Sequence, residues 1–118
     1  MRKTDKKIDR DLSAALTRVC HVALETVPGF AWITHFVNYQ NFPRSLVIVS
    51  VFETDELLRA ACALQLDQTL SDLIETELKA INIPINPKDG QLRCDSEEAC
   101  ERENDGDWLQ RYRYPQLH

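Results

Sequence analysis

Acidic side chains gather near the C-terminus at a density that could bind a partner. Between residues 95 and 107, seven acidic side chains accompany one arginine, so this segment carries −6. The other residues contribute 13 basic minus 12 acidic charges, or +1, which gives the chain total of −5. Clustered carboxylates attract basic surfaces and repel polyanions. The sequence therefore predicts an acidic face that binds a basic protein partner. The face is formed by Glu97, Glu98, Glu101 and Glu103.

Residues that could act as a nucleophile or a general base stand alone. His35 lies in an aromatic segment, and Glu53 or Asp55 could supply it with a carboxylate in space. No serine, threonine or lysine accompanies it in a recognisable catalytic motif. Cys94 has one basic neighbour, whereas glutamates surround Cys100 and raise the pKa of a thiol. No catalytic residue is expected, and an enzyme using His35 or Cys94 is the last of three function classes.

Metal, phosphate and cofactor sites are not expected either. Cys94 and Cys100 are separated by five residues, and Cys20 and His21 are adjacent, so neither pair has the spacing of a structural zinc site. The letters ENDG at 103–106 lack the ligand order of a calcium loop. The three glycines are isolated, whereas a phosphate-binding loop needs them clustered.

Basic side chains cluster at the two ends of the chain. Residues 2–11 carry five basic and three acidic side chains, a net of +2, and arginines alternate with tyrosines at 111–114 as in single-strand binders. Phosphate contacts dominate nucleic-acid affinity, so the negative chain total opposes such binding. A nucleic-acid-associated regulator is the second function class, with these candidate contacts: Lys3, Lys6, Lys7, Arg10, Arg111 and Arg113.

Apolar periodicity predicts a single α/β (α+β) domain over residues 1–118. Thr4, Thr54 and Ser96 are the expected helix caps. Ser45 to Phe52 is almost continuously apolar, as in a buried strand. The apolar pattern slips in phase at 65–68, which favours two helices at 54–65 and 67–80 over one bent helix at 54–80. The other expected elements are a helix over 5–27, strands at 30–38 and 45–52, a short strand at 91–95, a short helix at 97–103, and an aromatic and basic tail at 108–118.

These elements predict a small antiparallel sheet packed against two or three helices. The strand at 91–95 pairs either with residues 81–85 or with the main sheet. The order αββαα followed by one or two strands is similar to that of a type II KH domain. A KH domain grips RNA through a GXXG loop between its paired helices, and residues 65–68 read QLDQ at that junction. The sequence therefore allows a KH-like topology that lacks the GXXG loop by which KH domains bind RNA.

Three stretches resemble a known family. MRKTDKKID at 1–9, GFAWITHFVNYQNFPRSLVIVSVFET at 29–54 and DSEEACERENDGDW at 95–108 are similar to a group of small gammaproteobacterial proteins often labelled Fis-family transcriptional regulators. The resemblance spans nearly the whole chain but brings no established activity and no site residues. A Fis protein has a basic helix-turn-helix near its C-terminus, whereas this chain has Pro84, Pro87, Gly90 and the acidic segment there.

The favoured function is a non-catalytic interaction or regulatory module. The longest apolar run, at 46–52, is far too short to span a membrane, and the basic start has no apolar stretch behind it, so a cytoplasmic location is expected. The oligomeric state is open, and the aromatic strand at 30–38 could seed a dimer if it lies at a sheet edge.

Overall fold

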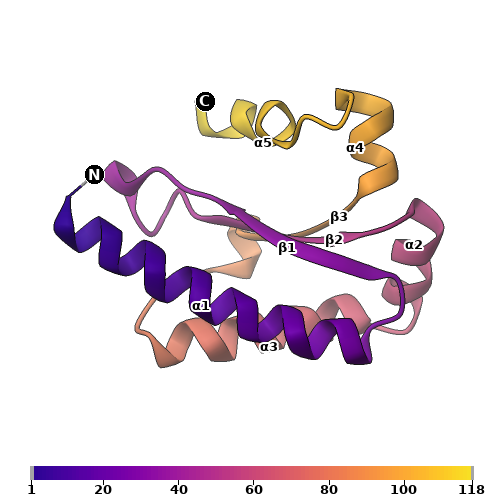
Figure 1. Ribbon diagram of the computed structural model, residues 1–118, viewed down its shortest axis with the longest axis horizontal. Coiled ribbons are helices and arrows are strands. Elements are labelled where there is room, and N and C mark those ends of the chain that lie inside the picture. The colour runs from indigo at the N-terminus through magenta and orange to yellow at the C-terminus, as the bar shows by residue number, and fades with distance from the viewer. Residues whose placement is uncertain (1, 118) are drawn as a thin grey trace.

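A mixed three-stranded sheet forms the centre of the protein (Figure 1). The structure, a computed structural model, describes residues 2–117, with side chains up to Tyr112. The strands β1 (Phe30–Phe36), β2 (Val47–Phe52) and β3 (Leu92–Ser96) lie in the order β1-β2-β3. β1 and β2 are antiparallel, as expected, but β3 runs parallel to β2. The expectation of an antiparallel sheet therefore holds for one of its two strand pairs, and β3 joins the main sheet rather than residues 81–85.

Helices cover both faces of this sheet. α1 (Lys3–Thr26) and α3 (Leu66–Ala80) pack side by side on one face, and α2 (Asp55–Ala63) lies at one end of the sheet (Figure 1). α4 (Glu97–Asn104) and α5 (Trp108–Leu117) lie on the opposite face. The residues expected to form a short aromatic and basic tail thus continue as a helix, and the chain is mixed α+β, as predicted.

α1 forms where the apolar spacing predicts it. Leu12, Ala15, Leu16, Val19 and Ala23 recur at steps of three and four residues and are all buried. The helix begins at Lys3, and Arg2 occupies the cap position without a side-chain bond. The predicted cap at Thr4 is therefore wrong, because that residue already lies inside the first turn.

The predicted break between the second and third helices is confirmed. Thr54 caps α2 by accepting a hydrogen bond from the Leu57 amide at 3.1 Å. α2 ends at Ala63, and Gln65 adopts a left-handed conformation at φ 60° before α3 begins. The left-handed residue turns the chain back, so that α3 packs along α1. The order up to β3 is αββααβ, and no glycine lies at this junction.

Two apolar layers follow from the alternation of side chains along the strands. Ile48 and Phe52 point from β2 toward α1 and α3, where they join the main core. Val49 and Val51 point to the other face, where Tyr112 of α5 covers them. β2 is thus buried on both faces, which explains its continuous apolar sequence.

Candidate interaction surfaces

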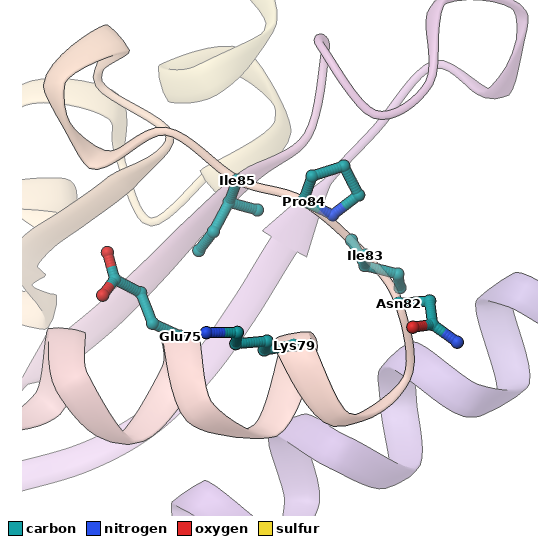
Figure 2. Close-up of a pocket in the computed structure, with 6 residues that line it drawn as sticks. All are labelled: Glu75, Lys79, Asn82, Ile83, Pro84 and Ile85. Atoms are coloured by element: carbon teal, nitrogen blue, oxygen red, sulfur yellow. The ribbon is translucent and has the colours of Figure 1, made fainter.

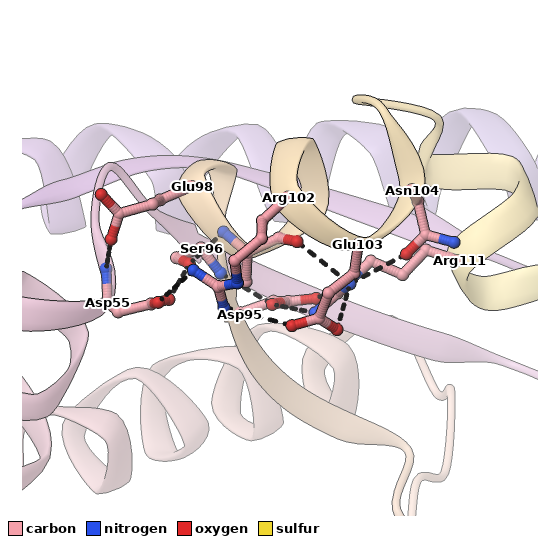
Figure 3. A network of polar contacts seen from close by, with 9 residues as sticks. Asp55, Asp95, Ser96, Glu98, Arg102, Glu103, Asn104 and Arg111 are labelled. Carbon is pink, nitrogen blue, oxygen red and sulfur yellow. Dashed lines mark hydrogen bonds and ion pairs between the residues drawn. The ribbon is translucent and has the colours of Figure 1, made fainter.

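A buried ion pair fastens α5 to the sheet. Asp95 of β3 is 7% exposed and receives two hydrogen bonds from Arg111 of α5, at 2.6 and 3.0 Å. The Tyr112 hydroxyl donates to the same carboxylate at 2.5 Å, and the Ser96 amide at 2.8 Å. Figure 3 shows this carboxylate beneath α4, with the guanidinium of Arg111 reaching it. A two-pronged, charge-assisted contact of this kind fixes both position and orientation.

The ionisation of this cluster follows from its contacts. Burial alone would raise the pKa of Asp95, but the hydrogen bonds from Arg111, Tyr112 and Ser96 outweigh it and lower that pKa below its usual value. The hydrogen bond to Asp95 in turn raises the pKa of Arg111. Burial and the same carboxylate raise the pKa of Tyr112. At neutral pH the cluster therefore holds one carboxylate, one guanidinium and one neutral phenol.

A second set of polar contacts joins α4 to the start of α2 (Figure 3). Ser96 caps α4, as predicted, by accepting from the Ala99 amide at 2.9 Å, and its hydroxyl donates to Asp55 at 2.5 Å. Glu98 accepts a hydrogen bond from the Asp55 amide at 3.1 Å, so a carboxylate of one helix caps another. Arg102 donates to Asp55 at 2.9 Å. Part of the acidic segment thus has a structural use.

The four glutamates predicted as a partner-binding face all lie on α4 and are exposed. Glu97 accepts from the Trp32 indole at 2.6 Å, and Glu103 receives Arg111 at 3.0 Å and Arg102 at 3.2 Å. The hydrogen bonds from these two arginines lower the pKa of Glu103. Glu98 caps α2, whereas no contact within the described residues is recorded for the side chain of Glu101. The structure thus brings the four together, but three of them also bind within the chain.

The predicted nucleic-acid contacts are not one surface. Lys3, Lys6, Lys7 and Arg10 are exposed on the first turns of α1. Arg111 belongs to α5 on the other side of the sheet, where its guanidinium pairs with Asp95 and Glu103. The side chain of Arg113 is outside the described side chains.

The basic start and the acidic segment lie apart. Figure 1 shows the first turn of α1 and α4 on opposite sides of the sheet and toward opposite ends of the molecule. Asp5 and Asp9 have local partners, because Asp5 pairs with Arg2 at 3.3 Å and Asp9 accepts from the Tyr39 hydroxyl at 2.5 Å. Among the described residues, the two segments therefore do not contact each other within one molecule.

The side chains considered for catalysis are not assembled into a reaction centre. His35 lies 3.7 Å from a carboxylate oxygen of Asp9, beyond hydrogen-bonding distance, and neither Glu53 nor Asp55 is its neighbour, because both follow the opposite end of the β1–β2 pair. Cys94 faces the helices α2 and α3 among apolar side chains. Burial, with smaller contributions from nearby groups, raises the pKa of the Cys94 thiol to about 12. Such a thiol is protonated at neutral pH and is a poor nucleophile.

A groove of about 470 Å³ runs between α1 and the outer edge of β1. Four consecutive residues of β1, from Trp32 to His35, line it. Neighbouring side chains of a strand point to opposite faces of the sheet. Four consecutive residues can therefore line the same groove only if the backbone edge of the strand forms its wall. The helix side is lined by Ser13, Leu16, Thr17, Cys20, His21 and Leu24. No hydrogen bond between a histidine and a hydroxyl or thiol is recorded in this groove within the described residues.

A second groove, of about 590 Å³, lies between the C-terminal turns of α3 and residues 82–85 (Figure 2). Glu75 and Lys79 line it from the helix, and Ile83, Pro84 and Ile85 line it from the following segment. It contains one carboxylate and one ammonium group but no histidine, cysteine or hydroxyl side chain. The composition gives no reason to assign it a reaction.

The surfaces above could be found from the sequence only in part. The acidic side chains were visible as a charge run, but the groove beside β1 depends on which strand is outermost.

Among residues 2–117, no three histidine, cysteine or acidic side chains are placed to hold a metal ion. None of the described helices is long and apolar enough to cross a membrane.

Comparison with known proteins gives no relative on which a function could be based. No protein-family model, no curated protein and no solved structure matches this chain. Any functional assignment must therefore come from the surfaces themselves.

Proposed function

We propose that this protein is a non-catalytic interaction module whose acidic helix α4 binds a basic segment of a partner protein. The observation that carries the proposal is the set of carboxylates left exposed after the internal contacts are made. Glu97, Glu98, Glu101, Asp105 and Asp107 are exposed, and among the described residues no ion pair is recorded for any of them. They retain five negative charges on one short stretch of surface.

The carboxylates are held on a fixed frame. Arg111 ties α5 to Asp95 and Glu103 of the acidic segment, and Ser96 and Glu98 tie α4 to α2. Glu97 is oriented by the Trp32 indole. A charged surface that is already ordered loses less side-chain freedom on binding than a flexible acidic tail would. The frame therefore supports recognition of a basic segment rather than only general repulsion of anions.

A binding titration tests this proposal. The labelled probe is a lysine- and arginine-rich peptide, followed by fluorescence anisotropy at low and at rising salt. The variant Glu97→Gln, Glu98→Gln, Glu101→Gln removes three charges but keeps oxygen atoms that can accept the bonds from Trp32 and the Asp55 amide. Exposed pairs contribute about 0.2–1 kcal/mol each, so the variant should bind about tenfold more weakly.

The matched control is Asp72→Asn, Glu75→Gln, Asp89→Asn, which removes three charges from other surfaces. It should bind nearly as tightly as the unmodified protein, and rising salt should weaken both by screening. An equal loss in both variants would show that only net charge matters, and no binding at about 100 μM, well above the range of specific contacts, would end the proposal.

Nucleic-acid binding through the start of α1 is the second candidate. Lys3, Lys6, Lys7 and Arg10 are exposed, no ion pair is recorded for them among the described residues, and they lie at the end of the molecule remote from α4. Two of the three aspartates in residues 2–11, Asp5 and Asp9, are engaged with Arg2 and Tyr39, and the four exposed cations dominate this part of α1.

A gel-shift titration with single- and double-stranded DNA and RNA at low salt tests this candidate. The shift should disappear in Lys3→Gln, Lys6→Gln, Lys7→Gln, because phosphate contacts supply the affinity. It should persist in Arg102→Gln, a control that removes a cation from α4. Absence of any shift with the unmodified protein would dispose of this function.

A further inference from the structure

The two outer strands of the sheet differ in how they are protected. β3 carries Arg93 and Asp95 among its five residues. β1, the other outer strand, reads FAWITHF over seven residues and contains no aspartate, glutamate, lysine, arginine or proline. Proteins commonly guard an open strand edge with charges or proline, because an unguarded edge can pair with another strand. Of the two outer strands, β1 is therefore the one whose edge is better able to pair with a strand of another molecule.

The backbone groups that β1 presents outward can be identified from the pairing of β2. The Ile48 amide bonds to the Gln91 carbonyl on the β3 side. Because backbone groups alternate in direction along a strand, Val47, Val49 and Val51 point their backbone groups toward β1. Their partners in β1 are Phe36, Thr34 and Trp32. The intervening residues, Ile33 and His35, consequently direct their amides and carbonyls away from the sheet, into the groove beside α1.

We propose that the β1 edge pairs with β1 of a second copy of this chain, antiparallel and across a two-fold axis, to form a continuous six-stranded sheet. A two-fold contact requires a surface that complements itself. The regular part of β1 spans 32–36, since the pairing with β2 is irregular between Phe30 and Trp32. Thr34 lies at its centre, so Ile33 of each copy bonds to His35 of the other.

This register also matches side chains on both faces. Residues placed equally far from Thr34 on either side meet across the axis, so Trp32 of one copy lies opposite Phe36 of the other. Aromatic pairs across neighbouring strands stabilise a sheet. On the opposite face, Ile33 and His35 meet above the groove, where Leu24 of α1 is 54% exposed. The groove thus offers uncovered apolar surface next to the unpaired backbone.

The charges on either side of β1 favour a second copy of this chain as the partner that pairs with the β1 edge. α1 and β1 run in opposite directions, with Asp9 near His35 and Val27 near Phe30. An antiparallel pair of β1 strands therefore brings the start of one α1 toward the end of the other. The start carries exposed Lys6, Lys7 and Arg10, and the opposite end carries exposed acidic side chains, namely Glu25, Glu53 and Glu56. Each interface contains this complementary arrangement twice, and the contact is independent of the acidic helix α4.

A pair of charge variants tests the interface. Thr34 is half-buried and would lie directly opposite its own copy, where like charges repel. Sedimentation velocity on the full chain up to about 200 μM, above the dissociation constants of most specific complexes, should show a species of twice the chain mass. Thr34→Lys and Thr34→Glu should each weaken this association at least about tenfold. An equal mixture of the two should restore it, because opposite charges then meet.

The mixture separates a lost contact from a lost fold, since two misfolded variants would not restore a dimer to each other. Thr76→Lys, at an exposed position on α3, is the matched control and should associate like the unmodified protein. The inference is overturned by an unmodified protein that stays monomeric over the whole range. A dimer that both Thr34 variants leave unchanged would overturn it equally.

Discussion

The ion pair between Asp95 and Arg111 allows a prediction in which both the size and the pH dependence follow from the structure. In Arg111→Met the carboxylate of Asp95 keeps its bonds from Tyr112 and Ser96 but loses its cation. Removal of one partner of a buried ion pair costs about 3–5 kcal/mol. The Arg111 side chain retains 16% exposure and that of Asp95 9%, so water can enter and the lower end applies. We expect a loss of about 3 kcal/mol at neutral pH, a large part of the stability of a small domain.

The sign of the pH dependence follows from the lowered pKa of Asp95. A carboxyl group whose pKa is lowered by folding stabilises the folded protein above its unfolded pKa, about 3.9, and this contribution is lost as pH falls through the lower folded value. Without Arg111, only the bonds from Tyr112 and Ser96 oppose the effect of burial, so the pKa of Asp95 in the folded variant should be higher than in the unmodified protein. The difference between the two proteins should therefore shrink as pH falls below about 4.

Urea unfolding at neutral pH and at about pH 3.5, just below the unfolded pKa, measures both quantities. Arg102→Met serves as the control, because the Arg102 side chain is 55% exposed and its loss should matter less. A loss below about 1 kcal/mol at neutral pH, the range of surface pairs, would refute the claim that the pair is buried and fixed. A difference that is the same at both pH values would refute the assignment of the effect to Asp95.

Three further outcomes are expected. Ser96→Ala removes the α4 cap and should lower the free energy of unfolding by about 1 kcal/mol in urea titrations, whereas Ser96→Asp should retain most of it. Gly29→Ala should lower it by at least about 1 kcal/mol in the same assay, because Gly29 has φ +82° and an added Cβ would lie 2.7 Å from Leu57 Cβ; an unchanged midpoint would contradict this. Cys94 should resist iodoacetamide in the folded protein at about pH 8, because it is half-buried and its pKa is raised to about 12; Cys62, whose pKa is also raised, is exposed and should be labelled first, as mass spectrometry of the digested protein can show.

Local features of the fold were predictable because they depend on neighbouring residues. The caps at Thr54 and Ser96 each require one hydroxyl next to a helical segment, and both were correctly predicted. The break near residue 65 appeared as a slip in the apolar phase, which the left-handed Gln65 confirms. The continuous apolar run of β2 predicted burial on both faces, because side chains that point to either face of the strand are apolar.

Long-range features were not predictable in the same way. The parallel alignment of β3 depends on how α2 and α3 carry the chain back across the sheet, which no local pattern states. Arg111 was taken for a free cation because charge alone does not show that a buried carboxylate awaits it. A signal was present, since Arg93 and Asp95 are two residues apart on a strand and therefore share one face, the face that α5 covers.

The acidic face of α4 combines a local feature that was predictable with a long-range contact that was not. Its four glutamates were correctly gathered on one helix, because Ser96 and the charge pattern predict α4. The use of Glu98 to cap α2 could not be foreseen, because it requires residues 55 and 98 to be neighbours in space. The function assigned to this helix therefore remains a proposal that its binding variants must test.

The contact between the two tryptophans provides an intrinsic optical signal. Trp32 of β1 and Trp108 of α5 are the two tryptophans of the chain, and their rings meet edge to face with centroids 5.0 Å apart. Any event that lifts α5 from the sheet separates the two indole rings, whereas Glu97 of α4 can still accept the hydrogen bond from Trp32. Emission wavelength and near-ultraviolet dichroism should consequently report detachment of the last helix without any attached dye, and can be compared with the far-ultraviolet loss of helix as a whole.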